Sequence, residues 1–171
     1  MTLRLFFLIA VSLFIAPPHA SALLGKALAL DGIRDYVQVE DAPDLYLRGA
    51  LTIGTWFRAE SLNAGTGGWQ ALFCKGTTPD QYPYNMREFG LWLNEAGSLE
   101  FAATPVGAEE NGRARQISSE AGIVRAGQWY HVAVVIDAVA ESMAIYLNGE
   151  RIAEGTFSAS GVRDSPGFLR I

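Results

Sequence analysis

Carboxylates are the most numerous side chains in this sequence that could do acid–base chemistry, and their spacing decides whether that chemistry is expected. Glycoside hydrolysis with retention needs two carboxyl groups about 5 Å apart across the scissile bond. Glu109 and Glu110 are adjacent, as are Glu40 and Asp41, so on a strand each pair would point to opposite faces. No E-x-D-x-x-E spacing occurs. The sequence therefore predicts no glycosidase centre.

Nucleophilic and zinc-dependent hydrolysis also lack the residues that they need. There is no G-x-S-x-G motif, and the single cysteine, Cys74, lies in an apolar run that favours a buried, inert thiol. His131 lies between apolar strand residues, where a core histidine is the ordinary interpretation. A Cys74–His131 dyad stays open, although nothing in the sequence places the two together. Zinc needs several Cys or His ligands. We predict that the chain is not an enzyme.

Aromatic side chains with polar neighbours are the residues best suited to binding a sugar, because such sites combine an aromatic platform with a few polar groups. The candidates are Trp56, Trp69, Trp92, Tyr82 and Tyr84. Trp56 and Trp92 are expected in strands, where core packing explains them as well or better. Tyr82, Tyr84 and Asn85 lie in an expected loop, where packing explains them less easily. We predict ligand contacts at Tyr82, Tyr84 and Asn85.

Length and charge limit the number of domains and the kinds of partner that we expect. The chain has 171 residues, half of them apolar, and a net charge of −5, which suits one domain with a substantial core. Nucleic acid and anionic membrane surfaces both require clustered basic residues, and the sequence has no such cluster. The composition therefore excludes nucleic acid as an expected partner.

The first 22 residues have the pattern of a cleaved signal peptide. Arg4 precedes the apolar run LFFLIAVSLFIA, which ends at Pro17-Pro18 and is followed by the small residues Ala20-Ser21-Ala22. An uncleaved anchor is the alternative, but the run is short for a membrane span. We predict a signal at 1–22 and one domain at 23–171, with no membrane insertion after cleavage. A single cysteine favours the bacterial periplasm or the outside medium.

Alternating apolar residues and closely spaced turn signals predict antiparallel strands along the domain, with no amphipathic helix. The expected strands are 26–30, 35–40, 51–58, 69–75, 89–93, 98–102, 116–118, 129–136, 143–147 and 151–157. Asn148-Gly149 is a strong signal for a type I′ hairpin turn. Both faces of 129–136 are apolar, so we expect this strand inside a layered structure and not on its surface. The pattern is typical of a β-sandwich.

Three motifs resemble those of laminin-G-like jelly-roll domains, within the concanavalin A-like lectin/glucanase superfamily. The first is LDGIRDYV, which begins at Leu30, and the second is LTIGTWF, which begins at Leu51. The third is GQWYHVA from Gly127, followed by IYLNG from Ile145. The resemblance covers 27–171 and implies an all-β, antiparallel jelly-roll sandwich.

The resemblance also implies a metal and a missing strand. Domains of this family often hold a structural calcium between the entry segment and the closing strand, and the matching carboxylates here are Asp31 and Asp35, on either side of Gly32. The alternative is that both residues cap turns. The segment 167–171 matches the start of a late family strand, and the family's closing strand does not follow it. We therefore expect a domain truncated before its closing strand, with unpaired neighbours at its end.

Together these features predict a secreted, non-catalytic module that binds carbohydrate or a glycosylated protein surface. A structural or adhesive spacer within a larger envelope protein is one alternative. A fragment of a polysaccharide-degrading enzyme is another. The fold alone does not choose among the three.

Overall fold

The structure is a computed structural model that describes residues 26–46, 49–62, 68–76, 87–108, 114–158 and 160–171. It divides into two units, Met1–Leu30 and Asp31–Ile171. In the first unit the structure describes 26–30, which are exposed and lie in no strand. The strand predicted there is therefore wrong, because a strand is stabilised only by a partner in a ladder. The predicted signal, 1–22, lies outside the described residues.

The second unit consists of strands and one short 3-10 turn, η1 (Pro43–Leu45). The strands are β1 (Gln38–Val39), β2 (Leu51–Arg58), β3 (Trp69–Gly76), β4 (Arg87–Asn94), β5 (Leu99–Ala103), β6 (Arg115–Ser118), β7 (Trp129–Asp137), β8 (Ser142–Leu147), β9 (Glu150–Thr156) and β10 (Leu169–Arg170). The part of the chain that the structure describes contains no α-helix, and none of it could cross a bilayer as a helix.

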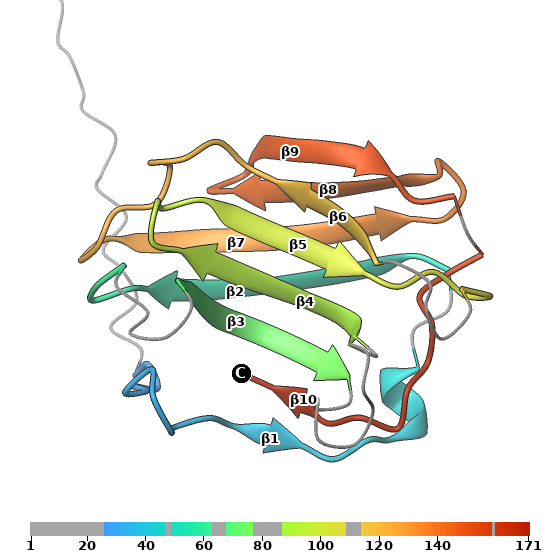
Figure 1. Cartoon of the computed structure of the whole chain (residues 1–171), viewed down its shortest axis with the longest axis horizontal. Coiled ribbons are helices and arrows are strands. Elements are labelled where there is room, and N and C mark those ends of the chain that lie inside the picture. Colours follow the sequence, from blue (N-terminus) through green and yellow to red (C-terminus); the bar gives the residue numbers. More distant parts are fainter. Residues whose placement is uncertain (1–25, 47–48, 63–67, 77–86, 109–113, 159) are drawn as a thin grey trace, which may run out of the picture. The chain divides into compact units, whose positions relative to one another are not determined.

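Two antiparallel sheets form the fold. The six-stranded sheet has the order β1-β10-β3-β4-β5-β6, and the four-stranded sheet has the order β2-β7-β8-β9. Figure 1 shows the first sheet lying over the second, with β3, β4 and β5 in front of β2 and β7. Strands far apart in sequence are neighbours, as where β10 lies between β1 and β3. The predicted all-β, antiparallel jelly-roll sandwich is confirmed.

The core lies between the two sheets and is built from alternate residues of each strand. Along β7 the inward residues Tyr130, Val132, Val134 and Ile136 are buried. Leu91 and Leu93 of β4 and Phe101 of β5 supply the facing layer and are completely buried. Burial of a side chain of this size stabilises the fold by about 1.5–3 kcal/mol, and this period-two alternation leaves every second side chain on an outer face.

The outer face of β7 differs from the expectation that this strand lies wholly inside the protein. Trp129 is 50% exposed, and His131, Ala133 and Val135 are half-buried. The strand is central in its sheet, but the sandwich has two layers, so in the described part of the chain each sheet is covered by the other on one face. The expected double burial is therefore wrong, although the predicted division of residues between the two faces is right.

The predicted hairpins are confirmed. Asn148 and Gly149 join β8 to β9 with φ angles of 52° and 88°, the left-handed region that a type I′ turn requires at both central residues. Strands β4 and β5 pair from Leu93↔Leu99 to Phe89↔Ala103 across the turn at 94–97. These turns join β4 to β5 and β8 to β9 as antiparallel neighbours.

A buried ionic network joins the two middle strands of the large sheet to segments near β1 and β10. Lys75 Nζ lies 2.5 Å from Glu88 Oε2, 3.0 Å from Asp41 Oδ1 and 3.0 Å from the Ser165 carbonyl oxygen. The side chains of Lys75 and Glu88 are completely or almost completely buried. Ser165 also donates from its backbone N–H and its hydroxyl to Glu88 Oε2. The charges are thus compensated by close partners.

Strand β10 is paired on both sides. Leu169 and Arg170 pair with Lys75 and Cys74 of β3, and with Val39 and Gln38 of β1. The expectation of unpaired neighbours at this strand is wrong, because the extended segment containing β1 lies along its outer edge. Whether a closing strand follows in the natural protein remains a prediction.

Candidate functional site

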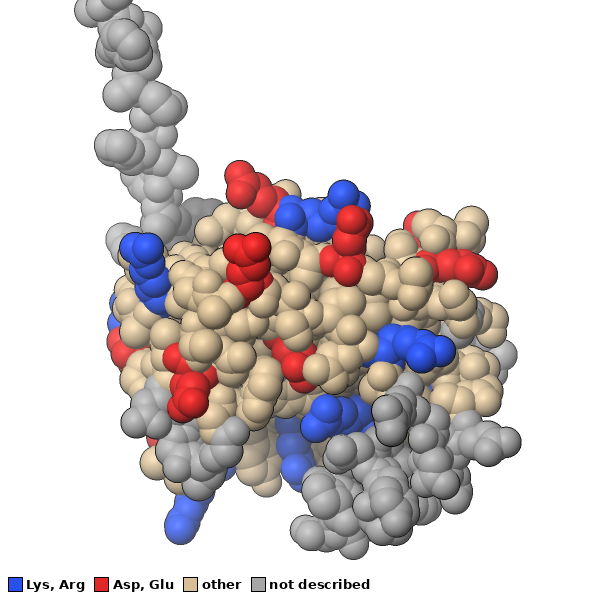
Figure 2. Space-filling model, turned by 45° about the horizontal axis from the view of Figure 1, so that its top comes forward, with Lys and Arg blue, Asp and Glu red and all other residues tan. Residues whose placement is uncertain are grey.

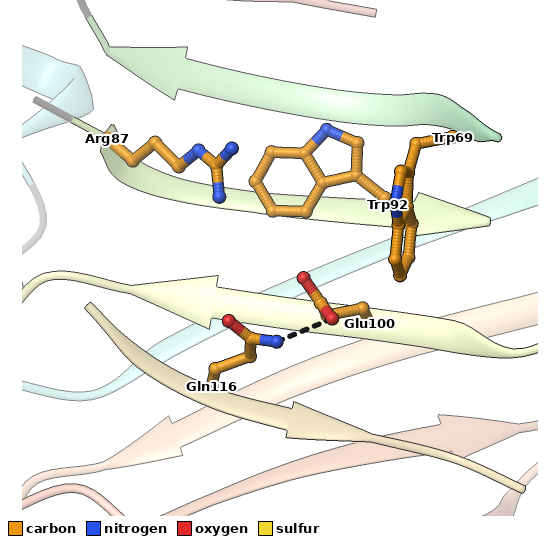
Figure 3. Close-up of a pocket in the computed structure, with 5 residues that line it drawn as sticks. All are labelled: Trp69, Arg87, Trp92, Glu100 and Gln116. Atoms are coloured by element: carbon orange, nitrogen blue, oxygen red, sulfur yellow. Dashed lines mark hydrogen bonds between the residues drawn. The ribbon is translucent and has the colours of Figure 1, made fainter. Parts of the chain in front are cut away.

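A pocket of about 320 Å³ lies on the outer face of the six-stranded sheet. The residues that line it come from four neighbouring strands: Trp69, Arg87, Trp92, Glu100 and Gln116. Figure 3 shows these side chains gathered above β3, β4, β5 and β6. We call this site the tryptophan pocket. It exists because antiparallel pairing sets Trp92 directly opposite Glu100, while the residues on either side of each point into the core.

Trp92 lies flat on the sheet because residue 90 is a glycine. A Cβ atom at Gly90 would lie 2.3 Å from Cη2 of the indole and under 3 Å from two more ring carbons. The ring therefore covers the bare backbone of Gly90, which is buried, and the indole is seen face-on in Figure 3. Trp69, 44% exposed, is seen edge-on beside it. The two indoles thus provide a platform and a wall, the arrangement that a sugar ring needs for stacking.

Arg87 lies at the other end of the platform. Its guanidinium carbon is 4.6 Å from the Trp92 ring centroid, which is a cation–π distance. Its backbone carbonyl accepts a hydrogen bond from the Thr104 hydroxyl, so the backbone of the residue is held in place. Within the described part of the chain no carboxylate forms an ion pair with its guanidinium. Arg87 lines the pocket, and its guanidinium carries a fork of N–H donors.

Glu100 and Gln116 form the polar side of the pocket. Gln116 Nε2 donates a 2.5 Å hydrogen bond to Glu100 Oε2, drawn as a dashed line in Figure 3. The Ser118 hydroxyl donates to the same oxygen at 3.4 Å. These bonds fix the carboxylate and leave Glu100 Oε1 and Gln116 Oε1 as hydrogen-bond acceptors. Among the described residues lining the pocket, Glu100 is the one carboxylate.

A second cation lies two strands away from Gly90 on the same face. Arg170 pairs with Cys74, and Cys74 pairs with Gly90. Burial raises the pKa of the Cys74 thiol, and the positive charges of Arg87 and Arg170 partly oppose that rise. Both guanidinium groups therefore act on this region of the sheet. Figure 2 shows basic side chains gathered in the lower middle of the view.

The predicted ligand residues Tyr82, Tyr84 and Asn85 lie outside the described residues. The sequence places them in the segment that joins β3 to β4, shortly before Arg87. Their role stays a prediction. Trp69 and Trp92 were among the predicted candidates, but the other residues of the tryptophan pocket were not. The sequence carried only a partial indication of them, because Glu100, Gln116 and Ser118 are polar residues at outward positions of two short strands.

Core packing was the preferred explanation for Trp56 and Trp92, and the structure contradicts it for both. Trp56 is 65% exposed on the outer face of the four-stranded sheet, and Trp92 lies half-buried in the pocket. His131 is half-buried beside Trp56, with ring centroids 5.3 Å apart, so it does not lie in the core. Cys74 and His131 belong to different sheets, and the structure does not bring this possible dyad together.

Asp31 and Asp35 form a tight turn, as the alternative to a metal site predicted. Asp31 Oδ1 accepts hydrogen bonds from the backbone N–H groups of Ile33, Arg34 and Asp35, and these lower the pKa of its carboxyl group. Asp35 Oδ2 accepts the Asp31 N–H at 3.2 Å. Calcium takes six to eight oxygens, and no group of three or more potential metal ligands occurs among the described residues. The pair alone falls short of a calcium shell, and the calcium stays a prediction.

Comparison with known proteins identifies the fold. A family model for the concanavalin A-like lectin/glucanases superfamily matches residues 31–171. A search of curated proteins finds no match. The carbohydrate-binding module CBM40 of the Ruminococcus gnavus IT-sialidase, solved with α2,3-sialyllactose, has a TM-score of 0.50 and 17% identity, and the match covers 71% of this chain and 62% of that chain.

Two further solved structures share the architecture. NanB, solved with Optactamide, has a TM-score of 0.64 and 16% identity, over 85% of this chain and 22% of that chain. Domains LG4–5 of the mouse laminin α1 chain have a TM-score of 0.54 and 12% identity, over 80% and 31%. The chain spans less than two thirds of the length of each of the three structures. At these identities the likeness is one of fold.

Proposed function

Because the chain belongs to the concanavalin A-like lectin/glucanases superfamily, we propose that it is a secreted, non-catalytic module that binds carbohydrate at the tryptophan pocket. The ligand is a glycan, free or carried on a protein surface. The observation that carries this proposal is the flat Trp92 indole over Gly90, with hydrogen-bonding side chains on one side of it. The sialyllactose bound by a module of the same fold is consistent with it.

Binding at this site would combine stacking and hydrogen bonding. The apolar face of a pyranose ring would lie on the Trp92 indole, with the Trp69 indole against its edge. The Glu100 carboxylate would accept hydrogen bonds from sugar hydroxyls, and the Gln116 amide oxygen would accept another. A volume of about 320 Å³ is at the small end of the range for ligand sites and suits one or two sugar rings.

The geometry of the pocket favours binding over hydrolysis. Cleavage of a glycosidic bond by the common mechanism needs a second carboxyl group within about 5–10 Å, on the opposite side of the bond. Glu100 has no carboxylate partner among the described lining residues, so the described part of the pocket lacks the carboxyl pair that this mechanism requires.

The remaining predictions belong to this proposal. Tyr82, Tyr84 and Asn85 would contact the ligand, and calcium at Asp31 and Asp35 would stabilise the entry segment. We also propose that the protein acts in the bacterial periplasm or outside the cell, where such glycans are found.

The proposal is tested by replacing Trp92 with alanine in the full chain and measuring binding on a glycan array. We expect the wild-type protein to bind a defined set of glycans and Trp92→Ala to bind them at least tenfold more weakly, because the platform is lost. Trp56→Ala is the matched control. It removes the same side chain from an exposed position on the other sheet and should leave binding unchanged.

Three results would contradict the proposal. Equal binding by the wild type and Trp92→Ala would place the glycan elsewhere on the protein. A blank array for the wild type would favour the spacer alternative, and turnover of a polysaccharide by the wild type would favour the enzyme alternative.

A further inference from the structure

We propose that the tryptophan pocket selects acidic sugars, and that Arg87 is the residue that recognises their carboxylate or sulfate group. This inference rests on the proposed function, because it names the class of glycan that the same pocket takes. The positive charge of Arg87 would make the pocket bind acidic sugars more tightly than neutral ones.

The first observation is the position of Arg87. It lines the pocket, and its guanidinium carbon lies over the Trp92 ring, 4.6 Å from the centroid, so the cation borders the space in which a sugar would bind. Figure 3 shows the guanidinium group of Arg87 beside the indole of Trp92. A carboxylate or sulfate on a stacked sugar would reach this fork, which matches such groups with two parallel hydrogen bonds.

The second observation is that the charge of Arg87 is not neutralised within the described residues. Arg58 and Arg151 on the other sheet have carboxylate partners, Glu60 and Glu154. Arg87 has no carboxylate partner among the described residues, although the Glu100 carboxylate lines the same pocket. Glu100 instead accepts hydrogen bonds from the neutral groups of Gln116 and Ser118.

The two charges also give the ligand an orientation. An acidic group near Glu100 would be repelled, whereas one near Arg87 would be attracted. The sugar would therefore place its acidic substituent over the β4 end at Arg87 and its hydroxyls over β5 and β6. Arg170, on the same face across Cys74 and Gly90, is closer in strand order to β4 than to β5, so its positive potential is stronger on the Arg87 strand than on the Glu100 strand.

The test uses the full chain on an array that carries each acidic glycan beside the same glycan with its carboxyl group reduced or its sulfate removed. We expect the wild type to prefer the acidic member of each bound pair by about tenfold or more, the size of a charge-assisted hydrogen bond. Arg87→Gln should lose this preference and bind both members equally. Arg87→Lys should keep part of it, because the charge remains but the paired donors do not.

Controls separate recognition from folding and from net charge. Arg151→Gln makes the same change in net charge on the other sheet and should keep the preference. The Tm of Arg87→Gln should match the wild type, because the hydrogen bond to Thr104 uses the Arg87 backbone. Titration of the tightest acidic glycan should show weaker binding at 0.2 M than at 0.05 M NaCl for the wild type, and little salt dependence for Arg87→Gln.

The inference fails independently of the proposed function. If the wild type binds neutral and acidic members equally, and Trp92→Ala abolishes both, the pocket binds sugar but Arg87 does not select acidic ones. A retained acidic preference in Arg87→Gln would also overturn the inference. If the wild type binds no glycan at all, the proposed function itself is overturned.

Discussion

The indole of Trp92 lies against the backbone of Gly90, so that even one carbon atom added at position 90 would overlap the ring at 2.3 Å. A glycine inside a strand normally weakens it, since it contributes no side chain to packing. Here the missing side chain is what lets a large aromatic ring lie parallel to the sheet. Gly90 is buried beneath the ring, and the indole lines the pocket together with Arg87, whose guanidinium carbon lies 4.6 Å from the ring centroid.

Gly90→Ala is therefore expected to weaken glycan binding by about tenfold while the fold persists. The added methyl group would displace the Trp92 ring, which can swing outward because it lies at the end of a side chain on the open face. Titration of the tightest array ligand measures the loss. Gly54→Ala is the matched control on the other sheet, where a Cβ would lie 3.4 Å from His131 Nε2 and needs little adjustment. Unchanged affinity in Gly90→Ala would contradict the flat-ring interpretation.

Lys75→Met should destabilise the protein by about 3–5 kcal/mol, because it leaves the buried carboxylate of Glu88 without its cation. Urea unfolding followed by tryptophan fluorescence gives the free energy of unfolding. The double variant Lys75→Met/Glu88→Gln should recover part of the loss, since the buried charge is also removed. Arg151→Met, which breaks an exposed ion pair with Glu154, should cost less than about 1 kcal/mol. If Lys75→Met lowers the free energy of unfolding no more than Arg151→Met does, the buried pair of Lys75 and Glu88 is no stronger than an exposed ion pair, and the prediction is wrong.

The same network predicts a loss of stability in alkali. Burial lowers the pKa of Lys75, but hydrogen bonds and charge attraction from Glu88 and Asp41 raise it by more, so the net shift is upward. A raised pKa in the folded state means that the ion pair contributes fully below the unfolded value of about 10.4 and is lost as the pH rises through the folded value. Urea unfolding at pH 8 to 11 should show this decline. In Lys75→Met the free energy of unfolding should fall less over this pH range. An equal fall in that variant would show that other groups cause the loss of stability.

The turn at Asp31 should form without calcium, because three backbone N–H groups already satisfy Asp31 Oδ1. In EDTA, NMR titration should give this carboxyl group a pKa below its ordinary value, so its contribution to the turn is present at neutral pH and is lost as the pH falls through the lowered pKa. The predicted metal site is tested in the same samples. Calcium-dependent shifts of the Asp31 and Asp35 signals with a higher Tm would support it. Unchanged spectra in millimolar calcium would contradict it.

Local pattern was enough for the strands and turns that depend on their own residues. The Asn148-Gly149 hairpin was predicted because few residue pairs tolerate positive φ at two successive positions. The two faces of 129–136 were assigned correctly because side chains alternate along any strand. The strand predicted at 26–30 failed, because alternation shows that a segment could pair but not that a partner strand is present.

Which face is covered, and what meets on it, is a question that only the tertiary structure answered. Trp56 and Trp92 were expected in the core because an apolar side chain on a strand gives no sign of which side the second sheet will occupy. The tryptophan pocket joins residues from Trp69 to Gln116 on four strands, and their adjacency comes from strand order and register. Alternation acts over two residues, whereas the packing of one sheet on another is set by contacts between distant parts of the chain. Local pattern was therefore enough to predict a two-layer β-sandwich, and contacts between distant strands settled which side chains meet in the tryptophan pocket.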